Sequence, residues 1–252
     1  MGFDPRAEAR LFGAALTTLT RLPWPLARLP ADWLARAAKF FPLVGALVGA
    51  GAGLACLGAT QLWPRPVPAF LAVAAALLLT GALHEDGLAD VADAAGARER
   101  ERKLAIMKDS RVGAFGVLAL IVAIGLKIAL LSALPALDAC LALVAAGAVS
   151  RFWAVIVMSR TGYAGDRDVA KLDHGIEGPG TSEVVLAAIL ALLPLLLLDQ
   201  GAAVAGLVLS ALGAALVAVP LCRSLGGYTG DVLGAVIAVG EIAFLLGAAI
   251  RP

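Results

Sequence analysis

The fold is decided by residues 113–158, which read GAFGVLALIVAIGLKIALLSALPALDACLALVAAGAVSRFWAVIVM. Two apolar runs, 113–134 and 136–158, are separated only by a hinge at Leu134-Pro135. Each run is slightly longer than the roughly 20 residues that an α-helix needs to cross the hydrocarbon core of a bilayer. A connection this short makes neighbouring helices antiparallel. The stretch therefore predicts a transmembrane helical hairpin.

The same length criterion finds five more apolar runs on either side of this hairpin. They are residues 40–62, 67–83, 184–199, 201–221 and 231–250. The runs 67–83 and 184–199 are short for a span, and the tight turn Asp199-Gln200-Gly201 makes a second hairpin. Inside a bilayer the backbone polar groups must bond within their own helix or a closed barrel. The sequence thus predicts an all-α polytopic membrane helix bundle, one integral membrane domain over 1–252 with about seven transmembrane helices.

The composition excludes an ordinary soluble domain. Of the 252 residues, 61% are hydrophobic and 15% are charged, whereas a soluble domain carries about 25% charged residues. The 20 basic and 19 acidic residues nearly cancel, so no global field attracts nucleic acid, and we expect no nucleic-acid partner. Cys56, Cys140 and Cys222 are widely spaced beside or within apolar runs, which predicts small buried hydrophobes rather than a disulfide or metal framework.

Residues 5–21 precede the first span and have an amphipathic pattern that ends at Pro23-Trp24-Pro25. This pattern predicts an amphipathic N-terminal helix lying at the membrane interface, with Trp24 and Trp33 at headgroup depth. Its arginines are spread along the segment and no small-residue cleavage site follows, so it does not have the form of a signal peptide.

Basic residues fall on alternate connections. The N-terminal arm and loops 84–112, 159–183 and 222–230 hold 16 of them, and the opposite connections hold only Arg65 and Arg251. The positive-inside rule then places the first set in the cytoplasm and the C-terminus outside. Because the loops rich in carboxylates, glycines and hydroxyls belong to the first set, we expect the functional site to face the cytoplasm.

The most informative polar segment is TGALHEDGLADVAD at residues 80–93. If it is helical, Asp86, Asp90 and Asp93 lie at i, i+4 and i+7, within about 60° of one another around the axis. Three carboxylates on one face repel each other unless a cation lies among them, and oxygen ligands suit Mg²⁺ or Mn²⁺. Gly87 leaves room for close approach. A solvated acidic helix end is the alternative, but aspartate is a poor helix former.

A second segment, IMKDSRVGAFG at residues 106–116, groups Lys108, Asp109, Ser110 and Arg111 before the third span. Such a cluster at a helix N-terminus suits a phosphate group, through its charge, free backbone N–H groups and the helix dipole. In the alternative interpretation, the two cations only anchor the span on its cytoplasmic side. The preceding RERERK at 98–103 alternates in sign, which is typical of a solvated helix.

A third segment, GGYTGDVLGA at residues 226–235, leads into the last span. It carries Asp231 toward the membrane, where an ionisable group is costly and usually faces a protein interior. We expect Asp231 to share the cation of the aspartate face, so the two helix ends should converge to a carboxylate separation of about 4 to 6 Å. Glu241, deeper in the span, is either a functional residue or a buried partner of Lys127 or Arg151.

Together these segments resemble one family, the cobalamin 5′-phosphate synthases, also called adenosylcobinamide-GDP ribazoletransferases. The resemblance rests on HEDGLADVAD at 84–93, on IMKDSRVGAFG at 106–116, and on GYTGD at 227–231 with LGA at 233–235. Their joint occurrence in this order is specific, whereas a lone Asp-Gly pair would not be.

The resemblance implies an Mg²⁺-dependent transferase in a bacterial inner (cytoplasmic) membrane. A ribose hydroxyl of α-ribazole or its 5′-phosphate would attack the cobinamide-linked phosphorus of adenosylcobinamide-GDP, and GMP would leave, in the last assembly step of the nucleotide loop. The implied catalytic residues are Asp86, Asp90, Asp93 and Asp231, and the implied metal ligands are these four with Glu85. The implied substrate-binding residues are His84, Lys108, Asp109, Ser110, Arg111 and Thr229. A homo-oligomer is compatible with the sequence.

Two other functions also explain carboxylates on membrane helices. A CDP-alcohol phosphotransferase uses Asp-Gly motifs, but its second aspartate pair is not found, and Ala89 is followed by Asp90 rather than by arginine. A cation-coupled transporter tends to have related halves and a site near the midplane. This sequence shows no internal repeat, and its charges gather at one side.

Overall fold

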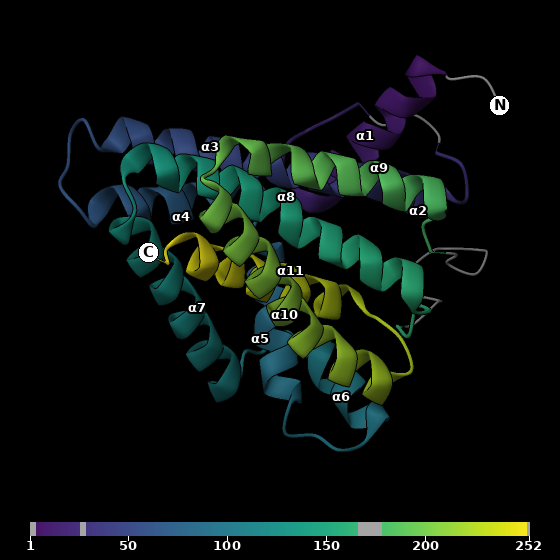
Figure 1. The fold of residues 1–252 in the computed structure, drawn as a ribbon. Coiled ribbons are helices and arrows are strands. Elements are labelled where there is room, and N and C mark those ends of the chain that lie inside the picture. The colour runs from purple at the N-terminus through teal and green to yellow at the C-terminus, as the bar shows by residue number, and fades with distance from the viewer. Residues whose placement is uncertain (1–3, 26–28, 166–177, 251–252) are drawn as a thin grey trace.

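The computed structural model describes residues 4–25, 29–165 and 178–250, and its regular elements in these ranges are helices (Figure 1). They are α1 (Pro5–Leu19), α2 (Trp33–Ala37), η1 (Ala38–Phe40), α3 (Phe41–Ala59), α4 (Val67–Thr80), α5 (Leu83–Ala94), α6 (Arg100–Met107), α7 (Ala114–Ala133), α8 (Ala136–Arg160), α9 (Thr181–Leu192), η2 (Leu193–Leu197), α10 (Gln200–Leu225) and α11 (Gly230–Ala248). The basic residues Arg28, Arg167, Lys171 and Arg251 of the charge count lie outside the described residues.

Each of the seven apolar runs forms a helix, which confirms the predicted all-α class. Five helical segments are long and apolar enough to cross a membrane: Trp33–Ala59, α7, α8, α10 and α11. The two runs noted as short, now α4 and α9 with η2, fall below that length among the described residues. The structure is therefore consistent with about seven spans, of which five meet the length criterion alone.

The helix ends alternate between two sides of the molecule (Figure 1). The turns α3–α4, α7–α8 and η2–α10 and the end of α11 lie toward the left of the view, and the α10–α11 connection lies toward the right. Arg65 ties two of the left-hand turns together, because its guanidinium donates to the carbonyls of Ser132 at 2.7 Å and Leu134 at 2.6 Å. This alternation is the one that antiparallel hairpins require.

Small residues bring α3 and α8 into backbone contact. Gly45, Gly49 and Gly53 recur every fourth residue along one face of α3, where a Cβ at each would overlap α8. Gly45 lies against the backbone of Gly147, and Gly53 lies against Cys140. Lipid supplies no hydrophobic drive between helices, so close van der Waals packing through small residues stabilises such a pair.

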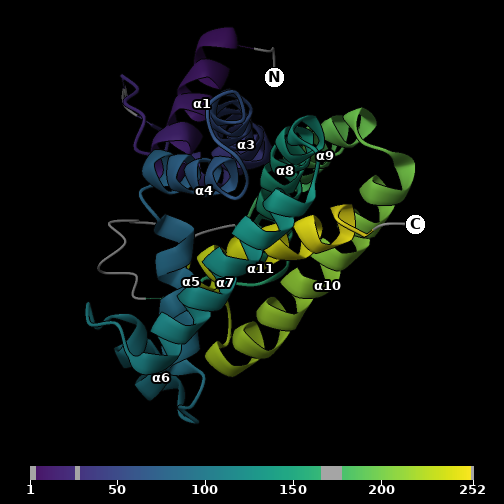
Figure 2. The same cartoon turned by 90° about the vertical axis from the view of Figure 1, so that its left-hand side faces the viewer.

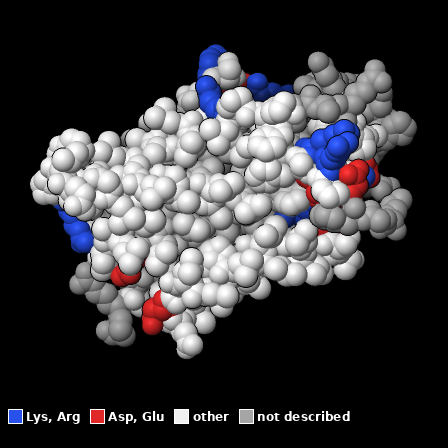
Figure 3. Space-filling model, turned by 90° about the horizontal axis from the view of Figure 1, so that it is seen from above, with Lys and Arg blue, Asp and Glu red and all other residues white. Residues whose placement is uncertain are grey.

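A second group of helices packs beneath α3, α4, α8 and α9. In Figure 2, α11 lies between α7 and α10, and it also packs on α5 and α8. The apolar stretches of α8 and α11 are mostly buried, whereas those of α7 and α10 are mostly exposed. The face seen in Figure 3 has a broad uncharged centre, with Lys, Arg, Asp and Glu gathered toward its ends and rim. That surface is what a bilayer would cover.

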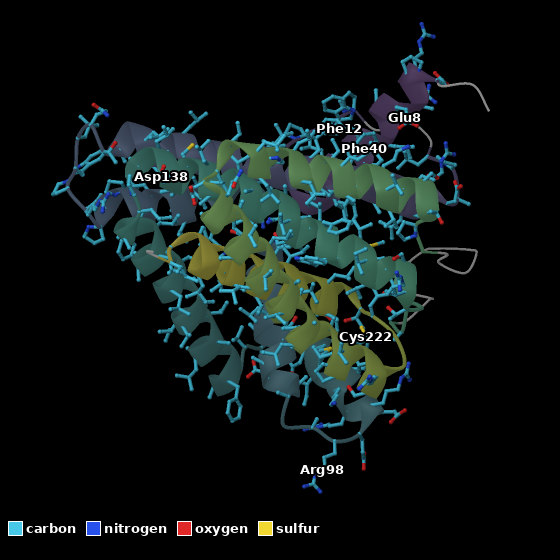
Figure 4. All side chains as sticks on the ribbon, viewed as in Figure 1. Glu8, Phe12, Phe40, Arg98, Asp138 and Cys222 are labelled. Atoms are coloured by element: carbon cyan, nitrogen blue, oxygen red, sulfur yellow. The ribbon has the colours of Figure 1, made fainter. Side chains whose placement is uncertain are left out.

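The predicted N-terminal helix is confirmed as α1, and it docks on the start of α3; its place at the membrane interface stays a prediction. The Glu8 carboxylate lies 2.7 Å from the Lys39 ammonium. The ring of Phe12 meets those of Phe40 and Trp24 edge-on, at centroid distances of 5.9 and 5.6 Å, and Figure 4 shows Phe12 beside Phe40. An ion pair and an aromatic cluster therefore hold α1 against the bundle.

Candidate active site

A sharp bend between α4 and α5 directs the acidic segment into the protein. Gly81 has φ of 67° and Ala82 has φ of 58°, and the two helices meet at 90°. The left-handed region is easy for glycine, but an alanine there carries strain of the order of 1 kcal/mol. Arg21 packs against Gly81, and its backbone N–H donates to the Leu79 carbonyl at 2.8 Å. The bend lays α5 along α7 and α11.

The predicted aspartate face is confirmed, because α5 is helical from Leu83 to Ala94. Asp86, Asp90 and Asp93 therefore share one side of this helix. Asp86 is exposed, and Asp90 and Asp93 are half-buried. The aspartate face is open to a ligand at one end and packed at the other.

The predicted convergence of α5 with the start of α11 is also confirmed. A Cβ at Gly87 would lie 2.7 Å from the Asp231 carbonyl oxygen and 3.0 Å from its Cα, so the two helices touch through their backbones there. The carboxylates of Asp86, Asp231 and Asp93 all act electrostatically on that of Asp90. Negative charge from two distant parts of the chain is thus concentrated in one place.

This concentration has the chemistry of a divalent-cation site. Mg²⁺ prefers oxygen ligands, and mutually repelling carboxylates gain most from a cation. Among the described residues, however, no three acidic, histidine or cysteine side chains are gathered closely enough to surround one ion. The predicted carboxylate separation of 4 to 6 Å and the shared cation therefore stay predictions.

Asp93 has a structural task that the sequence did not show. Its two carboxylate oxygens accept hydrogen bonds from the backbone N–H groups of Gly113, at 2.7 Å, and Gly116, at 2.8 Å. It therefore caps the N-terminus of α7, where a negative charge is favourable. The expectation that the backbone N–H groups of this helix start are free for phosphate is wrong for these two, because a carboxylate of the same chain binds them.

The same contact brings the segment 108–111 beside the aspartate face. Arg111 donates from Nη2 to Asp109 Oδ2 at 2.6 Å and from Nε to Asp109 Oδ1 at 3.0 Å. This paired guanidinium holds the pKa of Asp109 down, at about 2. Lys108, Ser110 and Arg111 are exposed. The structure thus places two cations of the predicted phosphate-binding segment at the surface, next to the carboxylates.

A buried ion network lies behind the aspartate face. Lys127 Nζ is 3.0 Å from Glu85 Oε1 and 3.2 Å from Glu241 Oε1. Glu241 also accepts from Arg151 at 2.7 Å, and Arg151 Nη2 lies 3.4 Å from His84 Nδ1. Glu241 is therefore the buried partner of both basic residues, the alternative left open by the sequence.

In this network Glu85 is the partner of a buried lysine. The residue was expected among the metal ligands, but its side chain is only 12% exposed and has Lys127 as its cation. On the helix it is about 100° from Asp86, so it faces α7 rather than the open end of the aspartate face. Its buried carboxylate is already neutralised by the chain itself.

A cavity of about 340 Å³ opens beside Asp86 and Asp231. Its lining comes from α1, α2, α3, α5, α8, α11 and the loops before α11 and after α8: Thr18, Leu19, Leu34, Phe41, Leu83, His84, Asp86, Ala154, Met158, Tyr163, Tyr228, Gly230, Asp231, Leu233, Gly234 and Ile237. A larger cavity, about 410 Å³, lies between α8 and α10, but its lining holds no acidic residue. A third cavity, about 430 Å³, has Asp138 and Asp199 in its lining, but the cavity beside Asp86 and Asp231 is the one that adjoins the aspartate face.

Two loops close this cavity against each other. The Tyr228 N–H donates to the Gly162 carbonyl at 2.9 Å, and the Ala164 N–H donates to the Tyr228 carbonyl at 2.8 Å. The rings of Tyr163 and Tyr228 meet edge-on at 5.6 Å. Arg100 of α6 donates to the carbonyls of Leu225, at 2.8 Å, and Ala164, at 3.1 Å. Three segments on this side of the bundle are thereby held together.

Thr229, expected to bind substrate, is the N-cap of α11. Its Oγ1 accepts from the Val232 N–H at 3.3 Å and lies 3.5 Å from Asp231 Oδ2. The side chain is buried, with 5% exposure. In this structure it orients the first turn of α11, and so the carboxylate of Asp231.

The tyrosines are the site residues that the sequence analysis missed. The chain has only two, Tyr163 and Tyr228, and each follows a glycine in a polar loop, which was an available signal. The Tyr228 hydroxyl and His84 Nε2 are buried without a hydrogen-bond partner, although both residues line the cavity. An unsatisfied buried polar group costs about 1 to 3 kcal/mol, so neither group is satisfied within the free protein.

Known proteins similar to this chain agree with the geometry. The family model described as cobalamin-5-phosphate synthase matches residues 11–249. A protein of Leptothrix cholodnii named adenosylcobinamide-GDP ribazoletransferase is 42% identical, over 95% of both chains. Proteins with the same name from Shewanella amazonensis and Escherichia coli O17:K52:H18 are 41% and 40% identical, over 91% and 94% of this chain and 91% and 98% of theirs. No solved structure matches.

The match spans the bundle from α1 to the end of α11 and includes all the segments that build the site. Relatives of this similarity cover nine-tenths or more of the chain. The chain therefore belongs to the cobalamin-5-phosphate synthase family.

Proposed function

We propose that this protein joins α-ribazole, or α-ribazole 5′-phosphate, to adenosylcobinamide-GDP and releases GMP. The name of its relatives supports the donor substrate. The observation that carries the proposal is the meeting of Asp86 and Asp90 on α5 with Asp231 on α11 at the edge of a cavity. A phosphoryl transfer needs such a concentration of cation-binding oxygens beside an enclosed substrate site.

The reaction exchanges one phosphoester partner for another. A ribose hydroxyl of the acceptor forms a bond to the phosphorus attached to cobinamide, and the bond from that phosphorus to the GMP oxygen breaks. The hydroxyl proton is lost to solvent or to a nearby carboxylate, and GMP leaves with the bonding electron pair. The product is adenosylcobalamin, or its 5′-phosphate when the acceptor is phosphorylated.

Asp86, Asp90 and Asp231 are the residues that would hold Mg²⁺. When bound, Mg²⁺ neutralises the diphosphate, stabilises the departing GMP and lowers the pKa of the attacking hydroxyl. The fit rests on the donor set, which consists of carboxylate oxygens that repel one another in the free protein. Asp93 supports this group by fixing the start of α7 against α5.

The segment 108–111 would bind the phosphate oxygens of the donor whose charge Mg²⁺ does not neutralise. Lys108 and Arg111 are exposed next to the aspartate face, and Asp109 orients the guanidinium of Arg111 through two hydrogen bonds. A guanidinium can pair with two phosphate oxygens at once. In this arrangement Arg111 exchanges part of its contact with Asp109 for the diphosphate of the donor.

We infer that the site faces the cytoplasm of a bacterial inner membrane. The aspartate face, segment 108–111 and the Tyr228 loop lie away from the turns that hold Arg65 and the end of α11 (Figure 1). The positive-inside rule assigns the Arg-rich and Lys-rich connections to the cytoplasm. Nucleotide substrates are found on that side.

The test is GMP release by the purified protein in detergent, with adenosylcobinamide-GDP, α-ribazole and Mg²⁺. Asp86→Asn and Asp90→Asn should lower the rate at least about 100-fold, because each removes charge worth several kcal/mol in the transition state. Chelation of Mg²⁺ should abolish release, and added Mg²⁺ should restore it.

Asp138→Asn is the matched control. Asp138 is exposed at the first turn of α8, at the opposite end of the molecule from Arg98 and Cys222 (Figure 4). This variant should keep the wild-type rate. Full activity of Asp86→Asn at limiting Mg²⁺, or no GMP from the wild-type protein, would show that the assignment is wrong.

A further inference from the structure

The cavity beside the carboxylates is apolar over most of its wall. Leu34, Phe41, Met158 and Ile237 contribute to this wall. Six of the sixteen lining residues have polar side chains, and two of these carry buried atoms without a hydrogen-bond partner, Tyr228 Oη and His84 Nε2. Tyr228 is 2% exposed and His84 is 3% exposed. The free protein thus holds a mostly apolar space that is lined by two residues whose buried polar atoms have no hydrogen-bond partner.

The parts of the proposed substrates differ in how well they suit this space. A corrinoid macrocycle is much larger than a ligand that fills about 340 Å³, which is the lower end of the range for drug-sized molecules. A guanosine diphosphate is charged and rich in hydrogen-bonding atoms, and an apolar wall would leave those atoms unsatisfied. The benzimidazole of α-ribazole is a flat, mostly apolar fused ring with one free ring nitrogen.

We propose that this cavity is the binding site for the base of the acceptor nucleoside. The inference rests on the proposed function and specifies which part of which substrate the cavity accepts. The fused ring packs on Phe41, Met158 and the Tyr163–Tyr228 pair, and the ribose lies at the edge formed by Asp86 and Asp231. In this orientation the attacking hydroxyl is next to the carboxylates that would hold the cation.

The Tyr228 hydroxyl donates to the free ring nitrogen in this arrangement. Both backbone polar groups of Tyr228 are held by the neighbouring loop, at 2.9 and 2.8 Å, and its ring is braced by Tyr163. The hydroxyl is therefore fixed in place before the ligand arrives. A hydrogen-bond donor that is already ordered and has no competing partner loses little conformational entropy when the ligand binds.

The imidazole of His84, in the same wall, is oriented by two buried charged residues. Arg151 can only donate hydrogen bonds, so its contact with Nδ1 at 3.4 Å directs the imidazole proton to Nε2. Glu241 in turn holds Arg151 at 2.7 Å. Arg151 and Glu241 are thus positioning residues for the imidazole.

Base selectivity follows from this chemistry. A purine nucleoside carries additional ring nitrogens, which would be buried against Leu34, Phe41 and Ile237 without partners. A site that satisfies one polar atom discriminates against ligands that bury several more. We expect kcat/KM for a benzimidazole riboside to exceed that for the matching purine riboside by at least about 10-fold.

Tyr228→Phe tests the hydrogen bond without disturbing the fold, because the hydroxyl has no partner in the free protein. Its thermal midpoint should equal or exceed that of the wild type. The KM for α-ribazole should rise about 3- to 10-fold, the range expected for one neutral hydrogen bond, and the KM for adenosylcobinamide-GDP should stay unchanged. An indole riboside, which lacks the free ring nitrogen, should show no difference between Tyr228→Phe and wild type.

Ala154→Leu tests whether the base of the acceptor occupies the cavity. Ala154 lines the cavity and is 1% exposed, so three added carbons occupy volume that the base would need. The KM for α-ribazole should rise at least about 10-fold. Ala214→Leu makes the same change at a buried alanine in the cavity between α8 and α10 and should leave both KM values unchanged.

Different results would refute the proposed function and the assignment of the cavity to the base. If the wild-type protein releases no GMP with any nucleoside, the proposed function is wrong. If it releases GMP but Tyr228→Phe shifts the KM for α-ribazole and for the indole riboside equally, or shifts neither, the hydrogen bond is refuted. If Ala154→Leu folds and raises the KM for adenosylcobinamide-GDP instead, the cavity accepts the donor and the base assignment is overturned. Should Ala154→Leu fail to fold, the Tyr228→Phe comparison still decides.

Discussion

The buried ion network predicts an unusual result for a double variant. The network holds two cations, Lys127 and Arg151, and two anions, Glu85 and Glu241, so it is neutral as a whole. Lys127→Met removes one cation and leaves a net negative charge among buried groups. Adding Glu85→Gln removes an anion as well, and the remaining pair, Arg151 with Glu241 at 2.7 Å, is again neutral.

The distances set the size of the effect. At Nζ–O separations of 3.0 and 3.2 Å, Coulomb's law with an effective dielectric constant of about 20 gives roughly 5 kcal/mol for each contact of Lys127. Desolvation of the charges offsets much of this, and breaking a buried pair from one side costs about 3 to 5 kcal/mol. Lys127→Met should therefore lower the ratio of folded to unfolded protein roughly 10²- to 10⁴-fold.

The double variant should be more stable than Lys127→Met by at least about 2 kcal/mol, because it buries no uncompensated charge. The free energy of unfolding can be measured in mixed micelles by titration with a denaturing detergent, using tryptophan fluorescence. The same samples report GMP release. If Glu85 is a partner of Lys127 and not a metal ligand, the double variant should keep its dependence on Mg²⁺ unchanged.

Glu101→Gln is the control for the chemical change alone. The side chain of Glu101 is 82% exposed, so the free energy of unfolding should change by less than about 0.5 kcal/mol. If the double variant is destabilised by the sum of its two single variants, charge balance is not what the network provides. If its GMP release needs much more Mg²⁺, Glu85 acts on the cation after all.

Three further results follow from the site geometry. Asp93→Asn should destabilise the protein by about 1 to 2 kcal/mol and speed amide exchange at the start of α7; unchanged exchange there would refute the capping role. Gly87→Ala, whose Cβ would lie 2.7 Å from the Asp231 carbonyl, should separate α5 from α11 and lower GMP release more than it lowers the thermal midpoint. Cysteines placed at Ser110 and Leu62 should be labelled from opposite sides of the membrane; labelling from one side would contradict the alternating topology.

The transmembrane helices were readable from the sequence because their backbone hydrogen bonds are local. A segment that must satisfy its own polar groups in lipid shows its length and apolarity directly. The runs 113–134 and 136–158 accordingly correspond to α7 at Ala114–Ala133 and α8 at Ala136–Arg160. The common face of Asp86, Asp90 and Asp93 was readable for the same reason, since helical periodicity is a local property.

The partners of individual charged residues were not readable in this way. Asp93 binds the start of α7 and Glu85 binds Lys127, although both lie on the same helix as Asp86. Periodicity gives the direction of a side chain around its own helix, but not which neighbour lies in that direction. The choice left open for Glu241 was decided by the positions of α7 and α8, which bring Lys127 and Arg151 to it from two sides.

The sequence by itself determined the membrane helices, the acidic face and the family resemblance, because each depends on residues within one helix or on segments read in order. The sequence also predicted that Asp231 meets α5, but only the tertiary structure decided that the two helices touch through their backbones at Gly87, and that Tyr163 and Tyr228 line a cavity beside them. These contacts join segments more than 60 residues apart. Their geometry depends on the 90° bend at Gly81 and Ala82 and on backbone contact at Gly87, so it arises from packing between helices and not from the pattern within any of them.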